Sequence, residues 1–120
     1  MKKIVTLLVI VTLAACGSST TDKKSGTDIT KDPVYQKGLA LVAKNQCFTC
    51  HNIDGPLTGP SYREVANKYG GWPDTIVEHL AQKVITGGNG VWGEIFMTPH
   101  PGISDDDAKA MVQYILLLKK

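Results

Sequence analysis

The chain has 120 residues, of which 42% are hydrophobic and 20% are charged, and its formal net charge is +2. Lys2 and Lys3 account for this whole excess of positive charge, so the rest of the chain is electrically balanced. A balanced chain without a basic stripe is not suited to binding phosphate backbones, and we expect no nucleic-acid partner. The length fits one small domain.

Residues 1–16 are typical of a secretion signal. A positive start, Met1 to Lys3, precedes an apolar run from Ile4 to Leu13, which is shorter than the roughly 20 residues that span a bilayer. The following Leu-Ala-Ala-Cys16 resembles the lipobox of bacterial lipoproteins. The resemblance implies removal of residues 1–15 and lipidation of Cys16, which would anchor the protein to a membrane outside the cytoplasm, facing the periplasm or at the cell surface. The alternative is a plain signal peptide with an incidental cysteine.

Residues 16–31 are expected to form a flexible tether after the lipidated Cys16. Ile29 is the only apolar side chain from Gly17 to Lys31, and so polar a segment cannot bury enough surface to fold. The predicted domain therefore comprises residues 32–120.

Four helices are predicted in this domain, which we expect to be all-α. They begin near Asp32, Ser61, Asp74 and Ser104, each with residues typical of a helix N-terminus. Apolar residues recur on one face of each helix. These are Val34, Gly38, Leu41 and Val42; Tyr62, Val65, Ala66 and Tyr69; Ile76, Val77, Leu80, Ala81 and Val84; and Ala108, Met111, Val112, Ile115 and Leu118.

No segment alternates like a strand for more than a few residues, so residues 52–60 and 87–103 are expected to be Gly- and Pro-rich loops. Two loops of this kind leave little conventional core between the helices. The sequence therefore indicates that a group other than side chains fills the centre of the domain.

The stretch NQCFTCHN contains Cys47, Cys50 and His51 in the order Cys-x-x-Cys-His. A structural zinc site is disfavoured because only His79 and His100 remain as further ligands, and they are isolated. A thiol redox pair is disfavoured because such a motif usually begins a helix in a βαβ unit. The motif is the attachment signature of c-type haem, and such haem is attached outside the cytoplasm, where the signal sends this chain.

Met97 is the candidate for the second iron ligand. Met1 is removed with the signal and Met111 lies in the apolar stripe of the last helix, whereas Met97 lies in a loop bounded by Pro99. A thioether suits ferrous haem. The alternative role of Met97 is to fill a gap in the core.

These features resemble class I monohaem cytochrome c, and in particular the small bacterial cytochromes c551 and c552. The similar stretches, over about residues 33–120, are CFTCH, GPSYREVANKY and VITGGNGVWGEIFMTPHPGISDDDAKAMVQYIL. The resemblance implies a cytochrome c fold of four to five short helices around one haem c. It implies thioether bonds from Cys47 and Cys50 and iron ligands from His51 and Met97.

The resemblance also implies supporting roles. The Pro60 carbonyl would accept a hydrogen bond from the iron-ligating histidine, and the Trp92 indole would donate to a haem propionate. Lys83 stands where the c551 type has an Arg that neutralises a propionate. Lysine keeps the positive charge but cannot make the paired hydrogen bonds of a guanidinium. Alternatively, Pro60 is a turn proline and Trp92 a core aromatic. Gly38 and Tyr114 would lie where the first and last helices cross.

Thr-Pro-His100 follows Met97 where the family often has Pro-Pro-Asn. His100 could donate a hydrogen bond to the methionine sulfur, replace Met97 as a ligand, or lie at the surface, which is the role we expect. His79 is expected to be solvated.

The predicted function is that of a membrane-anchored one-electron carrier, not an enzyme. Partners would be redox proteins, such as an oxidase, a reductase or a quinol-oxidising complex, that meet the haem edge near Cys47 and Cys50 in small transient contacts. We expect a monomer. The alternative is an open-iron haem protein, such as a peroxidase or gas sensor, which requires that Met97 does not bind the iron.

Overall fold

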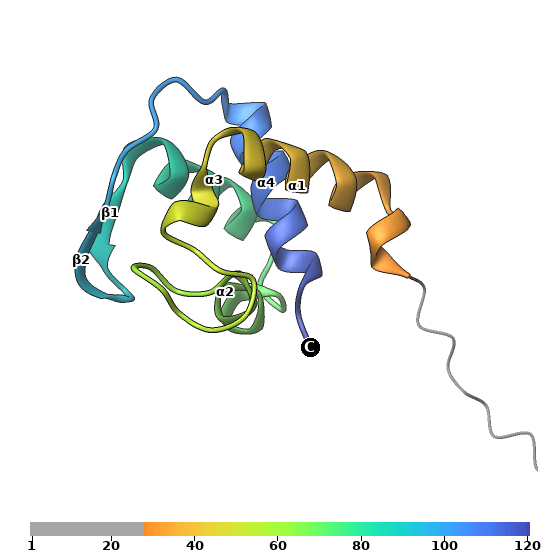
Figure 1. Ribbon diagram of the computed structural model, residues 1–120, viewed down its shortest axis with the longest axis horizontal. Coiled ribbons are helices and arrows are strands. Elements are labelled where there is room, and N and C mark those ends of the chain that lie inside the picture. Colours follow the sequence, from red (N-terminus) through yellow and green to blue (C-terminus); the bar gives the residue numbers. More distant parts are fainter. Residues whose placement is uncertain (1–27) are drawn as a thin grey trace, which may run out of the picture.

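The computed structural model describes residues 28–120, so the predicted signal peptide and Cys16 lie outside the described residues. Within them the helices are α1 (Pro33–Lys44), α2 (Tyr62–Tyr69), α3 (Thr75–Thr86) and α4 (Asp105–Leu117). Figure 1 shows α4 at the centre of the domain. The three other helices pack against it.

Three helix N-termini are capped as the sequence predicts. Asp32 accepts from the amide of Val34 at 2.8 Å, and Ser104 accepts from that of Asp107 at 3.2 Å. Ser61 and Glu64 form a reciprocal capping box at the start of α2. The Asp74 side chain, in contrast, makes no capping hydrogen bond to α3. The predicted helices are all present, and the fold is predominantly helical.

The crossing of α1 and α4 depends on Gly38. A Cβ atom at Gly38 would overlap the Cβ of Tyr114 and lie 2.6 Å from the Ala110 carbonyl oxygen. Tyr114 is fully buried, and its ring meets that of Tyr35 edge-on at 5.0 Å between centroids. The sequence prediction that Gly38 and Tyr114 meet at this crossing is confirmed.

A short antiparallel hairpin occupies part of the segment predicted to be a loop at residues 87–103. Its strands are β1 (Gly88–Gly90) and β2 (Gly93–Met97), with Gly88 opposite Met97 and Gly90 opposite Gly93. β2 has no alternating pattern because its side chains, apart from that of Met97, are exposed on both faces. Period-two alternation marks only strands with one buried face, so it could not reveal this one.

The described residues begin with a short 3₁₀ turn, Ile29–Lys31, before α1. Asp28 caps this turn by accepting from the amide of Thr30. The turn falls inside the predicted tether of residues 16–31, whose remainder lies outside the described residues. Across residues 28–120, every helix is too short or too polar to cross a bilayer.

Candidate functional site

The end of α1 brings Cys47, Cys50 and His51 into one turn. The Asn45 side chain donates to the Leu41 carbonyl at 2.9 Å, and Gln46 then adopts a left-handed conformation with φ of 56°. This reversal starts a 3₁₀ turn, Cys47–Thr49, in which the amides of Cys50 and His51 donate to the Cys47 carbonyl at 3.2 and 3.1 Å. The motif therefore folds into a compact unit immediately after α1.

Both thiols of this turn are free. Cys47 is half-buried and Cys50 is exposed. Burial raises the pKa of the Cys47 thiol, so this sulfur stays protonated near neutral pH when it is unmodified.

The His51 ring is held on two sides. Its Nδ1 lies 2.8 Å from the Pro60 carbonyl oxygen. A carbonyl can only accept a hydrogen bond, so Nδ1 carries the proton and the Nε2 lone pair is free to bind a metal. On one face the ring stacks on Tyr62 with 5.4 Å between centroids and 18° between planes. The contact between His51 and Pro60 is the one that the sequence analysis specified.

Two neighbours of His51 were not singled out from the sequence. Gly59 passes so close that a Cβ there would lie 2.5 Å from His51 Cε1 and 2.9 Å from Nδ1. Tyr62 was assigned only to a helix face, although it also supports the imidazole, and burial raises the pKa of its phenol well above the usual range. The sequence Thr-Gly-Pro-Ser-Tyr62 could have indicated both neighbours, since it places a glycine before Pro60 and an aromatic residue after it.

The loop of residues 52–60 is anchored at several points. The Gly59 amide donates to the Cys50 carbonyl at 2.9 Å, and the Tyr62 amide donates to the Asn52 carbonyl at 2.9 Å. The Arg63 guanidinium bridges the Asp54 carboxylate and the carbonyl of Leu118 at the end of α4. These bonds fix the loop that carries Pro60 relative to the cysteine turn and the core.

The remaining predicted residues lie on or beside the hairpin. Met97 is half-buried at the end of β2, opposite Gly88. Lys83, exposed on α3, extends its ammonium group toward Gly88, where a Cβ would lie 3.6 Å away. Trp92, 44% exposed in the turn between the strands, packs on Tyr69 with 6.4 Å between centroids. The structure thus groups Cys47, Cys50, His51 and Pro60, and places Met97, Lys83 and Trp92 at the hairpin.

The two other histidines differ from each other. His79 is exposed, as predicted. The expectation that His100 lies at the surface is wrong: it is half-buried, and its Nδ1 is buried without a hydrogen-bond partner. Its amide donates to the Ile85 carbonyl at 3.0 Å, which draws the residue in against the end of α3.

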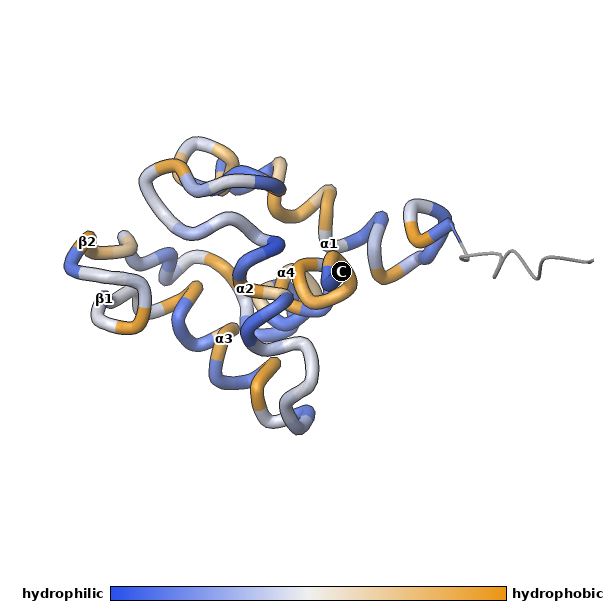
Figure 2. The backbone as a smooth tube through the Cα atoms, turned by 90° about the horizontal axis from the view of Figure 1, so that it is seen from below, coloured by the Kyte–Doolittle hydropathy of each residue, from blue (hydrophilic) through white to orange (hydrophobic). Residues whose placement is uncertain are grey.

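Exposed apolar side chains gather on the loop and the hairpin. Leu57, Val91, Ile95 and Phe96 are each 54–64% exposed. Figure 1 and Figure 2 show the hairpin and the loop that follows the cysteine turn at the same end of the domain, with hydrophobic residues along β2. Exposed apolar clusters of this kind usually mark binding sites.

Comparisons with known proteins agree with this geometry. The model of the cytochrome c family matches residues 35–119. Cytochrome c-552 of Nitrosomonas europaea is 42% identical over 84 residues, which cover 70% of this chain and 81% of that protein. Cytochrome c-551 of Azotobacter vinelandii is 40% identical over 84 residues, which cover 70% of this chain and all of that protein. The crystal structure of wild-type Nitrosomonas europaea cytochrome c552 aligns with a TM-score of 0.63 at 41% identity, covering 68% of this chain and 99% of that one.

The residues present suit the cofactor of this family. Haem c is bound covalently through the cysteines of a Cys-x-x-Cys-His motif, and the chain has one such motif, consistent with one haem per chain. Two free thiols next to an imidazole with an available Nε2 are the donor set that this attachment needs, and the exposed apolar side chains fit a large apolar disc. The chain belongs to the cytochrome c family, as a class I monohaem cytochrome c of the c551/c552 type that uses haem c to carry electrons.

Proposed function

We propose that the protein is a membrane-anchored one-electron carrier in which His51 and Met97 would be the two protein ligands of the haem iron. The observation that carries the proposal is the 2.8 Å contact between His51 Nδ1 and the Pro60 carbonyl, because it leaves Nε2 as the metal-binding nitrogen. Bound haem supplies one-electron chemistry between Fe(II) and Fe(III).

The residues around His51 hold this ligand in place. Tyr62 stacks on the ring, Pro60 fixes its tautomer, and the absence of a side chain at Gly59 makes room for the ring. The hydrogen bond that Nδ1 donates to the Pro60 carbonyl also makes the imidazole a more basic ligand. Because Tyr62 keeps its proton at physiological pH, it adds no charge beside the iron ligand.

Met97 is proposed as the opposite ligand because it is half-buried at the end of β2 and its backbone is fixed by the close approach of Gly87 and by pairing with Gly88. A neutral thioether favours Fe(II), and two protein ligands leave substrates no access to the iron. Cys47 and Cys50 would hold the haem by thioether bonds. Trp92 and Lys83, both beside the hairpin, would contact the propionates.

The test is the near-infrared spectrum of the oxidised holoprotein, in which a weak sulfur-to-iron charge-transfer band reports methionine ligation. We expect the band in the native protein and in Met111→Leu, since Met111 is 1% exposed in the α4 core, and we expect Met97→Ala to lose it. A native protein with a high-spin spectrum and no such band would support the open-iron alternative, a peroxidase or a gas sensor.

Anchoring through a lipid on Cys16 is proposed from the Leu-Ala-Ala-Cys sequence that ends the predicted signal. We expect Cys16→Ser to move the haem protein from the membrane fraction to the soluble extracytoplasmic fraction without changing its visible spectrum. Retention of the variant on the membrane would contradict the lipid anchor. Redox proteins such as an oxidase, a reductase or a quinol-oxidising complex are the proposed partners, which a monomeric carrier would meet one at a time.

A further inference from the structure

Three aromatic rings form a continuous row from the hairpin to the surface beyond α2. Trp92 packs on Tyr69 at 6.4 Å between centroids, and Tyr69 packs on Trp72 at 5.3 Å, both nearly edge-to-face. Tyr69 is 6% exposed, whereas Trp72 is 57% exposed in the turn between α2 and α3. These spacings are those of aromatic rings in contact. The row therefore connects a residue that we place beside the haem with an exposed tryptophan.

The surface around this row is basic. The Lys68 ammonium lies 5.7 Å from the centroid of Tyr69 and 5.4 Å from that of Trp92. Lys119 Nζ donates to the Gly70 carbonyl at 3.3 Å, next to the same turn. The two ammonium groups thus lie at Tyr69 and Gly70, which shortly precede Trp72 in the chain.

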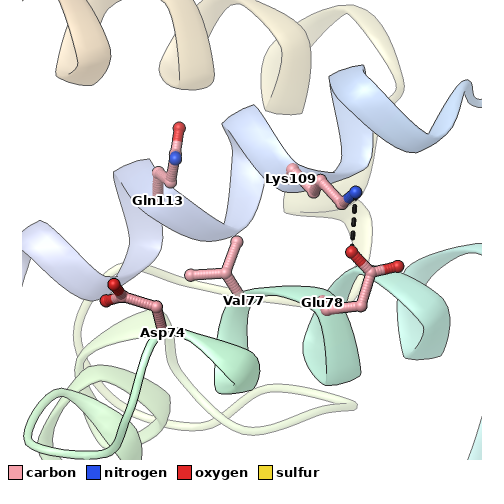
Figure 3. A pocket seen from close by; sticks show the side chains of 5 residues that line it. All are labelled: Asp74, Val77, Glu78, Lys109 and Gln113. Atoms are coloured by element: carbon pink, nitrogen blue, oxygen red, sulfur yellow. Dashed lines mark ion pairs between the residues drawn. The ribbon is translucent and has the colours of Figure 1, made fainter.

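Two acidic residues at the start of α3 line a different groove. Asp74 and Glu78 lie in a cavity of about 410 Å³ between α3 and α4, where Glu78 pairs with Lys109 at 2.6 Å. Figure 3 shows the side chains that line this groove, among them Val77 and Gln113, with the Lys109 ammonium group directed at the Glu78 carboxylate. Asp74 and Glu78 thus face the groove against α4, where Lys109 neutralises Glu78, whereas the ammonium groups of Lys68 and Lys119 lie at the C-terminal end of α2, which leads into Trp72.

A second cavity, of about 320 Å³, lies beside Trp72 and is lined also by Thr75, Ile76 and His79. An exposed tryptophan beside a cavity is a typical anchor of a protein interface, and flanking positive charge favours a negatively charged partner. We propose that the Trp72 surface, defined as Lys68, Tyr69, Trp72, His79 and Lys119, is an electron-transfer docking surface for an acidic redox protein. The proposal rests on the proposed function, since it places the haem beside Trp92.

The transfer at this surface is a one-electron step. Bound haem would supply the electron, its iron changing from Fe(II) to Fe(III), and the acceptor centre of the bound partner would be reduced by one electron. The three rings are neither oxidised nor reduced, and no proton moves. They provide a packed medium between the two redox centres, separate from the route across the haem edge near Cys47 and Cys50.

A photochemical experiment on the holoprotein tests the route. A ruthenium polypyridyl label on Thr75→Cys, at the Trp72 surface, injects an electron into the oxidised haem after a flash. We expect Trp72→Leu and Tyr69→Leu to slow haem reduction from this label severalfold, and Tyr69→Phe, which keeps the ring, to leave the rate unchanged. The matched control carries the label on Gln113→Cys, an exposed position on α4, where Trp72→Leu should have no effect.

The outcomes separate this proposal from the proposed function. Equal rates for the parent and the Leu variants at the Thr75→Cys label, with the haem still reduced, would overturn the Trp72 route alone. Failure of the haem to accept an electron from either label position would overturn the electron-carrier function and this proposal with it.

A charge-reversal experiment tests the choice of partner. The probe is hexacyanoferrate(III), an anionic one-electron acceptor, mixed with the reduced holoprotein at low ionic strength. We expect Lys68→Glu with Lys119→Glu to slow oxidation by about tenfold, because electrostatic attraction raises association rates by such factors. The control pair, Lys31→Glu with Lys37→Glu, changes the net charge by the same amount at exposed positions outside the Trp72 surface. It should slow oxidation of the haem much less. Equal slowing by the two pairs would contradict an acidic partner at the Trp72 surface.

Discussion

The segment that carries Cys47, Cys50 and His51 and the hairpin that carries Met97 are stabilised in different ways. On the His51 side the chain supplies its own support, through the Pro60 carbonyl, the Tyr62 ring and the backbone of Gly59. On the hairpin, Val91, Ile95 and Phe96 are 60–64% exposed. The comparison teaches that contacts within the protein shape the His51 side, whereas the exposed apolar side chains of the hairpin would pack against the bound haem.

The largest effect is expected from a change that breaks the support of His51. In Gly59→Ala the new methyl group would lie 2.5 Å from His51 Cε1, so the ring or the loop must shift. Overpacking of this kind typically costs about 1–3 kcal/mol, and here we also expect incomplete haem attachment. Thermal unfolding and the haem-to-protein ratio measure the two effects.

Gly102→Ala is the control for this change, because a Cβ at Gly102 meets no atom within 4 Å. It should leave both quantities unaltered. If the two variants behave alike, the close approach of Gly59 to His51 does not shape the site.

The next effect concerns the hairpin. If the haem covers β2, Ile95→Ser should destabilise the holoprotein by about 1–2 kcal/mol, as expected for a buried aliphatic side chain. Val34→Ser on α1 should change stability by no more than about 0.5 kcal/mol, the usual limit for surface positions. Val34 is 41% exposed and Ile95 is 64% exposed, so exposure in the protein alone predicts the reverse order. Denaturant unfolding of the two variant holoproteins shows which substitution is the more destabilising.

A smaller effect is expected from the anchor of the loop at residues 52–60. Arg63→Gln removes the ion pair with Asp54 and weakens the contact with the Leu118 carbonyl. Stability should fall by less than in Ile95→Ser, since the ion pair is partly solvated. The variant should also loosen His51, which a lower midpoint for displacement of the native ligands by added imidazole would report. An unchanged midpoint would show that the loop is held without Arg63.

The smallest effect is a change in acid sensitivity. The hydrogen bonds from Arg63 hold the pKa of Asp54 below its usual value. A carboxylate with a lowered folded pKa stabilises the fold above its unfolded pKa, near 3.9, and that contribution is lost as the pH falls through the folded pKa. Asp54→Asn should therefore be slightly less stable than the native protein at neutral pH and show a shallower loss of stability in acid. If the stability of the two proteins falls with equal slope as the pH is lowered, the Asp54 carboxylate does not make this contribution.

The sequence predicted the His51 side well because its signals are local. Cys47, Cys50 and His51 are adjacent in the chain, and Ser61 and Glu64 cap α2 through their fixed spacing. The packing of Gly38 on Tyr114 was also foreseen, from the resemblance to the family rather than from spacing.

The hairpin and His100 were predicted poorly for a physical reason. β2 has no buried face, so its side chains do not alternate, and its pairing depends on positive φ angles at Gly88, Gly90 and Gly93. His100 is drawn inward by a backbone hydrogen bond to Ile85, which residue identity does not encode. The hairpin thus lacks the alternation that marks a strand in the sequence, and the position of His100 depends on a contact with α3 that side-chain spacing does not reveal.

Carbon monoxide binding to the reduced holoprotein tests the central claim, that His51 and Met97 close the iron from both sides. The account predicts slow and weak binding by the native protein, and rapid binding by Met97→Ala, in which one side is open. Met111→Leu should behave as the native protein does. Native protein that binds carbon monoxide as readily as Met97→Ala would show that Met97 does not close the site.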